Sequence, residues 1–243
     1  MKINMLNTDS IDIIVLNCNN DGIIQPCIDS ILKNTVQPYK LIVVDQNSKD
    51  GSKEWLQKKG LPHLILNKMN VGTAKARNQA VYASDSPWIA FIDSDIEIKD
   101  SLWVDKMWNY TIDHKIGYIE GACTIKKWES GERLYQGLSF CMIRRQCLNE
   151  VGYFDRKFKI EEDLEWLARF RWSWWKMAYC SDVNVLHKKS LTIKGSLNTV
   201  RFQMQEESKK LLRNKYKEKF IQKTLGDILE SRERKNQELK KSS

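Results

Sequence analysis

Asp93 and Asp95 are the residues whose type and spacing first suggest chemistry. They follow residues 88–92, an apolar run without a charge, which predicts a strand buried on both faces. Ligands of open α/β sheets collect beyond the carboxyl ends of the strands, where carboxylate oxygens suit a hard divalent cation carrying a phosphorylated ligand. An isolated Asp-x-Asp is also common in a solvated turn, so the rest of the chain has to decide between these interpretations.

Other ionisable side chains also stand at the ends of predicted elements. Asp45 and His187 each follow a predicted strand, and Glu161, Glu162 and Asp163 open a predicted helix. Each has a plainer interpretation as well. Acids in a first turn stabilise the helix dipole, and a single histidine after a strand is often a hydrogen-bonded loop residue.

The elements that must position these groups alternate in the first part of the chain. Strands are predicted over residues 11–16, 40–44, 64–66 and 88–92. Helices follow them, one beginning near Pro26, one running through Leu56 after a cap at Asp50 or Ser52, and one over residues 73–83. Such alternation implies a mostly parallel, right-handed sheet with helices on both faces, which would bind a nucleotide across the edge where its strands end.

The alternation breaks after residue 100. A helix is predicted over residues 100–112 with Leu102, Trp103, Met107 and Trp108 facing inward. Beyond it we expect strands at 117–122 and 138–143, with a polar connection at 126–133 between them, and then a helix at 144–151 that ends at Gly152. A further helix is expected from residue 161, and short strands are expected at 177–179 and 183–186. The residues near one face of this further helix are Leu164, Leu167, Phe170, Arg171 and Trp174. This half would form the wall for an acceptor.

Composition limits the class of protein. The chain has 243 residues, 42% of them hydrophobic, which is enough for one large α/β domain plus an appendage. Its apolar runs are far shorter than a membrane span, its start does not resemble a signal peptide, and its six cysteines form no Cys-x-x-Cys pair. Reduced thiols and a cytoplasmic location are therefore expected.

The tail over residues 191–243 is basic and amphipathic and is expected to be helical. A net charge of +9 would allow attraction to nucleic acid, anionic lipid or phosphorylated substrates. The lysines and arginines of the tail are interleaved with glutamates, which argues against nucleic acid. Peripheral contact with the inner face of a membrane is the preferred use, and a helix pair that only covers the core is the alternative.

The ordered set of motifs resembles a family-2-type glycosyltransferase with the GT-A fold. The resemblance runs from about residue 11 to about residue 187 and rests on five stretches, at 43–52, 70–78, 91–95, 151–155 and 162–167. It implies a GT-A domain over residues 1–190, with a nucleotide-binding half at about 1–100 and an acceptor half at about 101–190, followed by the helical tail.

The resemblance also implies roles for single residues. Those for the nucleotide are Asn17, Asn19, Asp45, Asn47, Gly72, Arg77, Asp93 and Ser94. Asp45 would accept a hydrogen bond from the imide N–H of a pyrimidine base, and Gly72 would let the backbone approach the nucleoside because it has no Cβ.

For the reaction itself, the resemblance implies Asp95 and His187 as ligands of a Mn or Mg ion that bridges two phosphates. Asp163 would be the general base, with Glu162 or Glu161 in that role if the register differs by one. Direct displacement of this kind inverts the anomeric centre.

Two departures from the family pattern affect the substrates. Cys18 stands where many members carry an aromatic residue that supports the base, so UDP is the first expectation and dTDP or GDP stays open. Trp174 stands where the helix after Asp163 usually ends on Gly, so this helix must end differently. Trp174 and Trp175 either pack in the core or form a platform near the acceptor, with Glu162 beside it.

The function predicted is transfer of a sugar from a nucleotide diphosphate to a hydroxyl of a cell-surface glycan or its lipid-linked precursor. The alternative is a catalytically silent GT-A domain that binds a nucleotide sugar or a glycan as a partner subunit.

Overall fold

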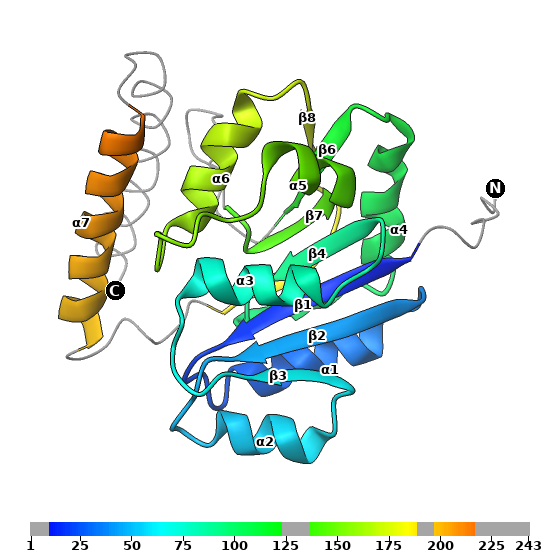
Figure 1. Ribbon diagram of the computed structural model, residues 1–243. Coiled ribbons are helices and arrows are strands. Elements are labelled where there is room, and N and C mark those ends of the chain that lie inside the picture. Colours follow the sequence, from blue (N-terminus) through cyan, green and yellow to red (C-terminus); the bar gives the residue numbers. More distant parts are fainter. Residues whose placement is uncertain (1–9, 123–136, 189–196, 217–243) are drawn as a thin grey trace, which may run out of the picture.

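The computed structural model describes residues 10–122, 137–188 and 197–216. Within these residues a seven-stranded sheet, in the order β3-β2-β1-β4-β7-β6-β8, forms the centre of the molecule, with helices on both faces (Figure 1). The predicted α/β architecture is therefore confirmed. The predicted polar connection at 126–133 and the tail beyond residue 216 lie outside the described residues.

The first four strands of the chain lie side by side and run parallel to one another. They are β1 (Ile11–Asn17), β2 (Tyr39–Asp45), β3 (His63–Leu66) and β4 (Trp88–Ile92). The helices α1 (Ile24–Asn34), α2 (Ser52–Lys59) and α3 (Thr73–Tyr82) connect them. Asn17 pairs in register with Asp45, so the polar residues at the ends of β1 and β2 reach the same edge of the sheet.

The second part of the sheet contains a reversed strand. β7 (Phe140–Arg144) runs antiparallel to β4 and to β6 (Ile116–Gly121), and β8 (Lys176–Cys180) runs parallel to β6. The helices of this part are α4 (Trp103–Trp108), α5 (Arg145–Val151) and α6 (Glu162–Arg171). The predicted break in the alternation thus coincides with a strand, β7, that lies beside β4 in the opposite direction, whereas β6 and β8 run in the same direction as β4.

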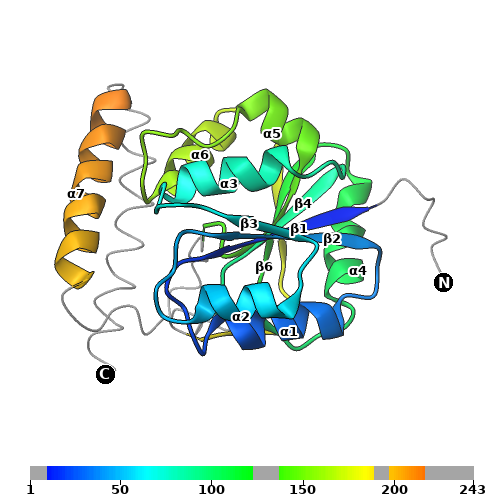
Figure 2. The same ribbon diagram turned by 60° about the horizontal axis from the view of Figure 1, so that its bottom comes forward.

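Two hydrophobic clusters fill the two faces of the sheet. One face packs against α1, α2 and α4, and the other packs against α3, α5 and α6 (Figure 2). Neighbouring residues of β1 alternate between them, since Ile13 belongs to the first cluster and Ile14 to the second. This burial on both faces explains why the strands read as continuous apolar runs.

One helix was predicted incorrectly at its start. Leu102 was expected to face inward, but it is 54% exposed, whereas Trp103 and Met107 are buried as predicted. The carboxylate of Asp100 accepts a hydrogen bond of 2.9 Å from the backbone N–H of Leu102 and forms a turn there. The helix therefore begins only at Trp103, and it continues as a short 3-10 helix, η1 (Asn109–Ile112).

A small two-stranded ribbon lies apart from the main sheet. β5 (Ile96–Ile98) pairs antiparallel with β9 (Val185–His187). Strand β5 was not predicted, because three residues are too few to show the alternation of apolar and polar side chains that marks a strand. The ribbon matters because it joins the chain after Asp95 to the chain around His187.

Helix α7 (Leu197–Lys215) stands beside α6 in both views (Figures 1 and 2). Leu212 of α7 packs with Phe158, Leu164 and Ala168 in a third apolar cluster. The prediction that the tail is helical is confirmed over these residues. Among the described residues, no helix combines the length and the apolar composition that a bilayer crossing requires.

Candidate active site

Asp93 and Asp95 flank a tight turn at the end of β4. The backbone N–H of Asp93 donates a 2.8 Å hydrogen bond to Ser139, and the N–H of Ile96 donates a 3.0 Å bond to the carbonyl of Asp93. Ser94 between the two acids accepts a 3.0 Å hydrogen bond from the side chain of Asn20. The turn is fixed on both sides, so the two carboxylates have defined positions at the edge of the sheet.

His187 lies next to Asp95 although it comes from a late strand. The β5–β9 register pairs Ile96 with His187, and the backbone N–H of Lys188 donates a 2.8 Å bond to the carbonyl of Asp95. As a result Nε2 of His187 lies 3.3 Å from Oδ2 of Asp95, with 22% and 12% of the two side chains exposed. The structure therefore brings the two predicted metal ligands together.

This pair fits the chemistry of a divalent ion held only in part by protein. A carboxylate oxygen with an imidazole nitrogen suits Mn2+ better than Mg2+. Within residues 10–122, 137–188 and 197–216, the side chains of His, Cys, Asp and Glu form no group of three or more that could hold a metal. An ion at Asp95 and His187 would therefore need further ligands, such as phosphate oxygens of a substrate.

Arg77 of α3 links two of the acidic groups. Its Nε donates a 2.8 Å hydrogen bond to Glu162, and its second guanidinium nitrogen lies 3.4 Å from Asp93. The guanidinium also lies over the ring of Phe91, 5.1 Å from its centre. Burial by itself would lower the pKa of Arg77, but the charges of Glu162 and Asp93 outweigh that effect and raise it. Arg77 therefore stays charged and fixes both carboxylates.

The two acids beside Arg77 have raised pKa values. For Asp93, 40% of whose side chain is still exposed, partial removal from water raises the pKa, Arg77 opposes this, and the nearby Asp95 adds to it. For Glu162, burial raises the pKa against the lowering effect of Arg77. Crowding of like charges around one arginine is typical of functional sites, although structural networks show it too.

Gly72 allows a close contact between two backbone segments. It adopts φ 85° and ψ 157°, and a Cβ at this position would lie 3.1 Å from Cα and 3.3 Å from the carbonyl oxygen of Lys159. The next residue, Thr73, donates from its backbone N–H to that same carbonyl at 2.9 Å. In this structure Gly72 thus lets the chain at Lys159 approach α3, and its role toward a nucleoside stays a prediction.

The three acids at the start of α6 have three different environments. Glu161 precedes the helix at φ 62° and accepts a 3.1 Å hydrogen bond from Gln205 of α7. Glu162 is buried and bonded to Arg77 and Thr73. Asp163 is only partly buried, and its Oδ1 accepts a 2.8 Å bond from the backbone N–H of Leu164. Of Glu162 and Asp163, Asp163 is therefore the more exposed residue.

Asp45 and Asn17 are fully buried beneath the loop that follows β2. One oxygen of Asp45 accepts from the side chains of Asn17 at 2.7 Å and Ser48 at 2.6 Å, and the other accepts from the backbone N–H of Ser48 at 3.0 Å. Asn17 also donates 2.9 Å to Ser52. In this conformation both residues hold the loop in shape and do not line its surface.

Asn19 and Asn47, by contrast, lie at that surface in left-handed conformations, with φ 54° and 62°. Asn19 accepts a 2.7 Å bond from the backbone N–H of Lys49, and its own N–H donates 2.9 Å to Ser48. Ser48 was not among the predicted site residues, although it bonds to both Asp45 and Asn19. The feature that could have identified it is a hydroxyl close after Asp45 in a loop rich in turn residues.

Cys18 has a partner at the same edge of the sheet. Its sulfur accepts a 3.3 Å contact from the side-chain amide of Asn70, and Asn70 accepts a 2.9 Å bond from the N–H of Gly72. Burial raises the pKa of Cys18, which favours the neutral thiol. The chain thus replaces the expected aromatic residue with a thiol–amide pair between β1 and α3.

Trp174 and Trp175 do not join this group. Both indole N–H groups donate to Glu150 of α5, and their rings stack with centres 4.1 Å apart. Trp175 is buried, as one interpretation predicted, and Trp174 is 59% exposed. Both residues come after the C-terminal end of α6, whereas Glu162 begins this helix. A helix of this length separates its two ends by about 15 Å. Helix α6 ends without glycine, in tight turns from Trp172 to Arg169 and from Ser173 to Phe170.

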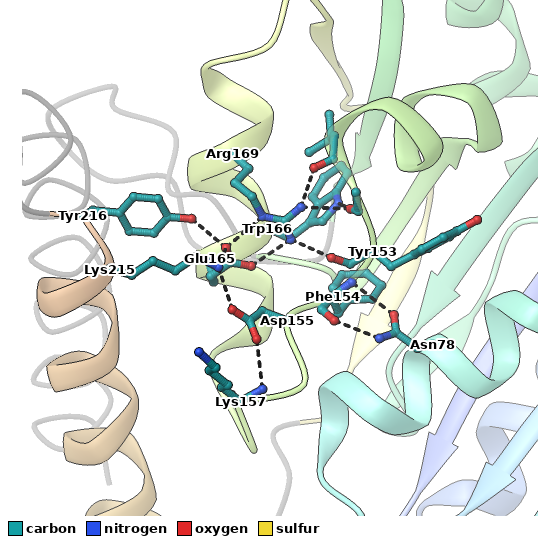
Figure 3. A network of polar contacts seen from close by, with 12 residues as sticks. Asn78, Tyr153, Phe154, Asp155, Lys157, Glu165, Trp166, Arg169, Lys215 and Tyr216 are labelled. Atoms are coloured by element: carbon teal, nitrogen blue, oxygen red, sulfur yellow. Dashed lines mark hydrogen bonds and ion pairs between the residues drawn. The ribbon is translucent and has the colours of Figure 1, made fainter.

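A dense polar network holds the segment between α5 and α6 (Figure 3). The guanidinium of Arg169 donates to the backbone carbonyls of Val151, Gly152 and Tyr153 and to Glu165. On the other side, the side chain of Asn78 exchanges hydrogen bonds of 2.8 and 3.1 Å with the backbone of Phe154. This segment therefore sits rigidly between α6 and α3 and leads directly to the acids of α6.

Comparison with known proteins finds a matching family and several relatives. The model of the family "Glycosyl transferase family 2" matches residues 12–191. The O-antigen chain rhamnosyltransferase RfbN of Salmonella typhimurium is 24% identical over 203 residues, which are 71% of this chain and 65% of that protein. Across the curated relatives it matches, the chain spans between 13% and 65% of their own lengths.

Solved structures show the same fold. The mannosyltransferase PcManGT from Pyrobaculum calidifontis, in complex with GDP-Man and Mn2+, matches with a TM-score of 0.62 at 16% identity over 79% of this chain and 60% of that one. S. aureus TarS 1-349, in complex with UDP-GlcNAc, matches with a TM-score of 0.64 at 17% identity over 91% and 72%. With its family model matched over most of its length, this chain belongs to glycosyl transferase family 2 and has the GT-A fold.

Proposed function

We propose that the protein is a metal-dependent, inverting glycosyltransferase that moves a sugar from a nucleotide diphosphate to a hydroxyl of a cell-surface glycan or its lipid-linked precursor. One observation carries the proposal. The Asp95–His187 pair and the Arg77 cluster, which includes Asp93 and Glu162, lie at the sheet edge beside the first turn of α6, and the charge of Asp163 acts on Arg77.

Asp95 and His187 are the residues that hold the divalent cation, Mn2+ in preference to Mg2+. When bound, the cation supplies charge neutralisation to the departing nucleoside diphosphate. Arg77 holds Asp93 in place, and Asp93 faces the ribose or the ligand shell of the cation. The complex of PcManGT with GDP-Man and Mn2+ supports this assignment for a protein of the same fold.

Asp163 acts as the general base. It takes the proton of the acceptor hydroxyl as that oxygen bonds to the anomeric carbon. The bond from this carbon to the diphosphate oxygen breaks, and its electron pair leaves with the nucleoside diphosphate. Attack from the side opposite the leaving group inverts the anomeric centre. General-base assistance of this kind contributes about 10² to 10⁴ in rate.

The proposed donor and acceptor rest on the relatives and on solved structures of the same fold. UDP is the preferred nucleotide because TarS has been solved with UDP and UDP-GlcNAc, and GDP or dTDP remains an alternative because Cys18 replaces the expected aromatic residue. The O-antigen chain rhamnosyltransferase among the relatives supports a cell-surface glycan. Peripheral membrane contact through the basic tail at the inner membrane face would bring the protein to a lipid-linked acceptor, and sedimentation with anionic vesicles at low salt tests this.

A thermal-shift series with UDP, dTDP and GDP, each with and without Mn2+, tests the proposal. We expect one nucleotide to stabilise the protein only when Mn2+ is present. Asp95→Asn should abolish this shift, whereas Asp163→Asn should keep the shift and lose sugar transfer. Asp85→Asn, at an exposed surface acid that pairs with Lys40, is the matched control and should behave like the wild type.

Full transfer activity in both site variants would refute the assignment. If no nucleotide stabilises a protein that melts cooperatively, the catalytically silent domain becomes the better explanation, and glycans become the ligands to test.

A further inference from the structure

Helix α7 lies beyond residues 12–191, which the family model matches, yet it contacts the chain that leads to the acids of α6. The hydroxyl of Ser208, which is 2% exposed, donates a 2.9 Å hydrogen bond to the backbone carbonyl of Ile160. The side-chain amide of Gln205, on the preceding turn of α7, donates 3.1 Å to the carboxylate of Glu161. Both contacts therefore fall on the two residues immediately before α6.

These two residues include a strained backbone position. Glu161 adopts φ 62° and ψ 20°, a left-handed conformation that residues with a Cβ rarely take. Such conformations persist when the surrounding structure holds them, and they cluster at functional sites. The conformation of Glu161 sets the direction in which α6 begins, and hence where Glu162 and Asp163 point.

The same stretch is held from the opposite side by α3. Thr73 donates from its backbone N–H to the carbonyl of Lys159 at 2.9 Å, and its hydroxyl, which also contacts Glu162, lies 2.9 Å from the same carbonyl. The chain from Lys159 to Glu161 is therefore clamped between the start of α3 and the middle of α7. One side of this clamp belongs to the matched family domain, and the other is supplied by the added helix.

A second anchor fixes α7 along α6 (Figure 3). The buried carboxylate of Glu165 accepts a hydrogen bond of 2.8 Å from Lys215 and one of 2.6 Å from the hydroxyl of Tyr216. The ammonium group of Lys215 also lies 2.6 Å from the carboxylate of Asp155. Leu212 fills the apolar space between these two sets of polar contacts. Polar contacts on both sides of Leu212 therefore hold α7 in register against α6.

We propose that Gln205 and Ser208 are positioning residues that hold the Ile160–Glu161 turn and thereby aim Asp163 at the acceptor hydroxyl. This inference rests on the proposed function, because it assigns Asp163 the role of base. Neither residue touches a substrate. Each acts through the backbone that begins α6.

The test compares the double variant Gln205→Ala/Ser208→Ala with the wild type and with Glu207→Ala, an exposed neighbour on the same turns of α7. The readouts are the metal-dependent thermal shift with the nucleotide that the wild type binds, and kcat and KM for hydrolysis of UDP-GlcNAc, GDP-mannose or a dTDP-sugar, with water as the acceptor. We expect the double variant to lose about tenfold to hundredfold in kcat, with KM and the nucleotide shift unchanged. Gln205→Lys, which keeps a donor opposite Glu161, should retain more turnover than Gln205→Ala.

Turnover of the double variant within twofold of the wild type would overturn the inference. So would a loss of kcat matched by a loss of nucleotide binding, because that pattern indicates general loosening. If the double variant does not fold, Gln205→Ala alone decides, since Gln205 is only partly buried. A wild type that binds no nucleotide and hydrolyses no donor would instead refute the proposed function, and the role of α7 would fall with it.

Discussion

Replacing Gly72 with alanine tests whether this glycine serves the close approach of Lys159 to α3. If Gly72 serves the approach of Lys159, an added methyl group should destabilise the protein whether or not a nucleotide is present. Its Cβ would lie 3.1 Å from Cα of Lys159 and 3.3 Å from the carbonyl oxygen. That carbonyl accepts a hydrogen bond from the backbone N–H of Thr73 and also contacts the Thr73 hydroxyl, so the backbone cannot move away freely.

The expected magnitude has two parts. The conformation at φ 85° and ψ 157° belongs to a region that only glycine adopts readily, which costs alanine about 1–3 kcal/mol. The contact with Lys159 is closer than the roughly 3.5–4.0 Å that carbon atoms prefer and adds about 1 kcal/mol. Together they predict a loss of about 2–4 kcal/mol, which lowers Tm by about 4–16 °C in a protein of this size.

Urea and thermal unfolding of Gly72→Ala, with Gly60→Ala as the control, measure this effect. Gly60 also has a positive φ, 70°, but its added Cβ would meet nothing within 4 Å, so it should show the conformational cost of about 1–2 kcal/mol alone. Equal losses in the two variants would refute the contact with Lys159. Unchanged stability with weakened nucleotide binding would restore the original prediction that Gly72 serves the nucleoside.

Two further predictions concern buried charges. Arg77→Met should cost about 3–5 kcal/mol in urea unfolding, because it leaves the buried Glu162 without its partner, and Glu162→Gln should restore part of the loss. In Arg77→Met the pKa of the buried Glu162 is raised further, so Glu162 would take up a proton on folding. The loss of unfolding free energy should therefore be larger at pH 8 than at pH 5. An equal loss at both pH values would contradict the reasoning. For Glu165, burial alone would raise the pKa, but bonds from Arg169, Lys215 and Tyr216 outweigh it and lower the pKa. The stability from this group is present above the ordinary pKa of about 4.3 and is lost as pH falls through the lower folded value, so Glu165→Gln should flatten the fall in stability between about pH 5 and 3.

Much of the fold could be predicted because its signals are local. The parallel strands carry uninterrupted apolar runs, the helices between them have their own period, and the acids at Asp93 and Asp95 follow directly from the end of a strand. The short strand β5 and the late start of α4 were missed. Three residues show no period, and a side-chain bond from Asp100 decides where α4 begins.

The candidate site could be predicted only as a set of residue types. His187 and Asp95 both stood out, but only the pairing of β5 with β9 brings them within 3.3 Å. The register of α6 was open among three acids, and the burial of Glu162 on Arg77, 85 residues away in sequence, separates its role from that of Asp163. For Trp174 the sequence left core packing and an acceptor platform open, and only the structure shows that this residue lies beyond the end of α6 that is opposite to Glu162.

The sequence by itself determined the alternation of elements, the apolar character of the strands and the acids that end them, because each depends on neighbours along the chain. Tertiary structure alone decided which polar groups meet. It buried Asp45 under its own loop, set Gly72 against Lys159 and packed α7 against the residues that begin α6. These contacts join segments that are distant in sequence, and their geometry depends on how the helices and the β5–β9 ribbon pack around the sheet, which no local pattern encodes.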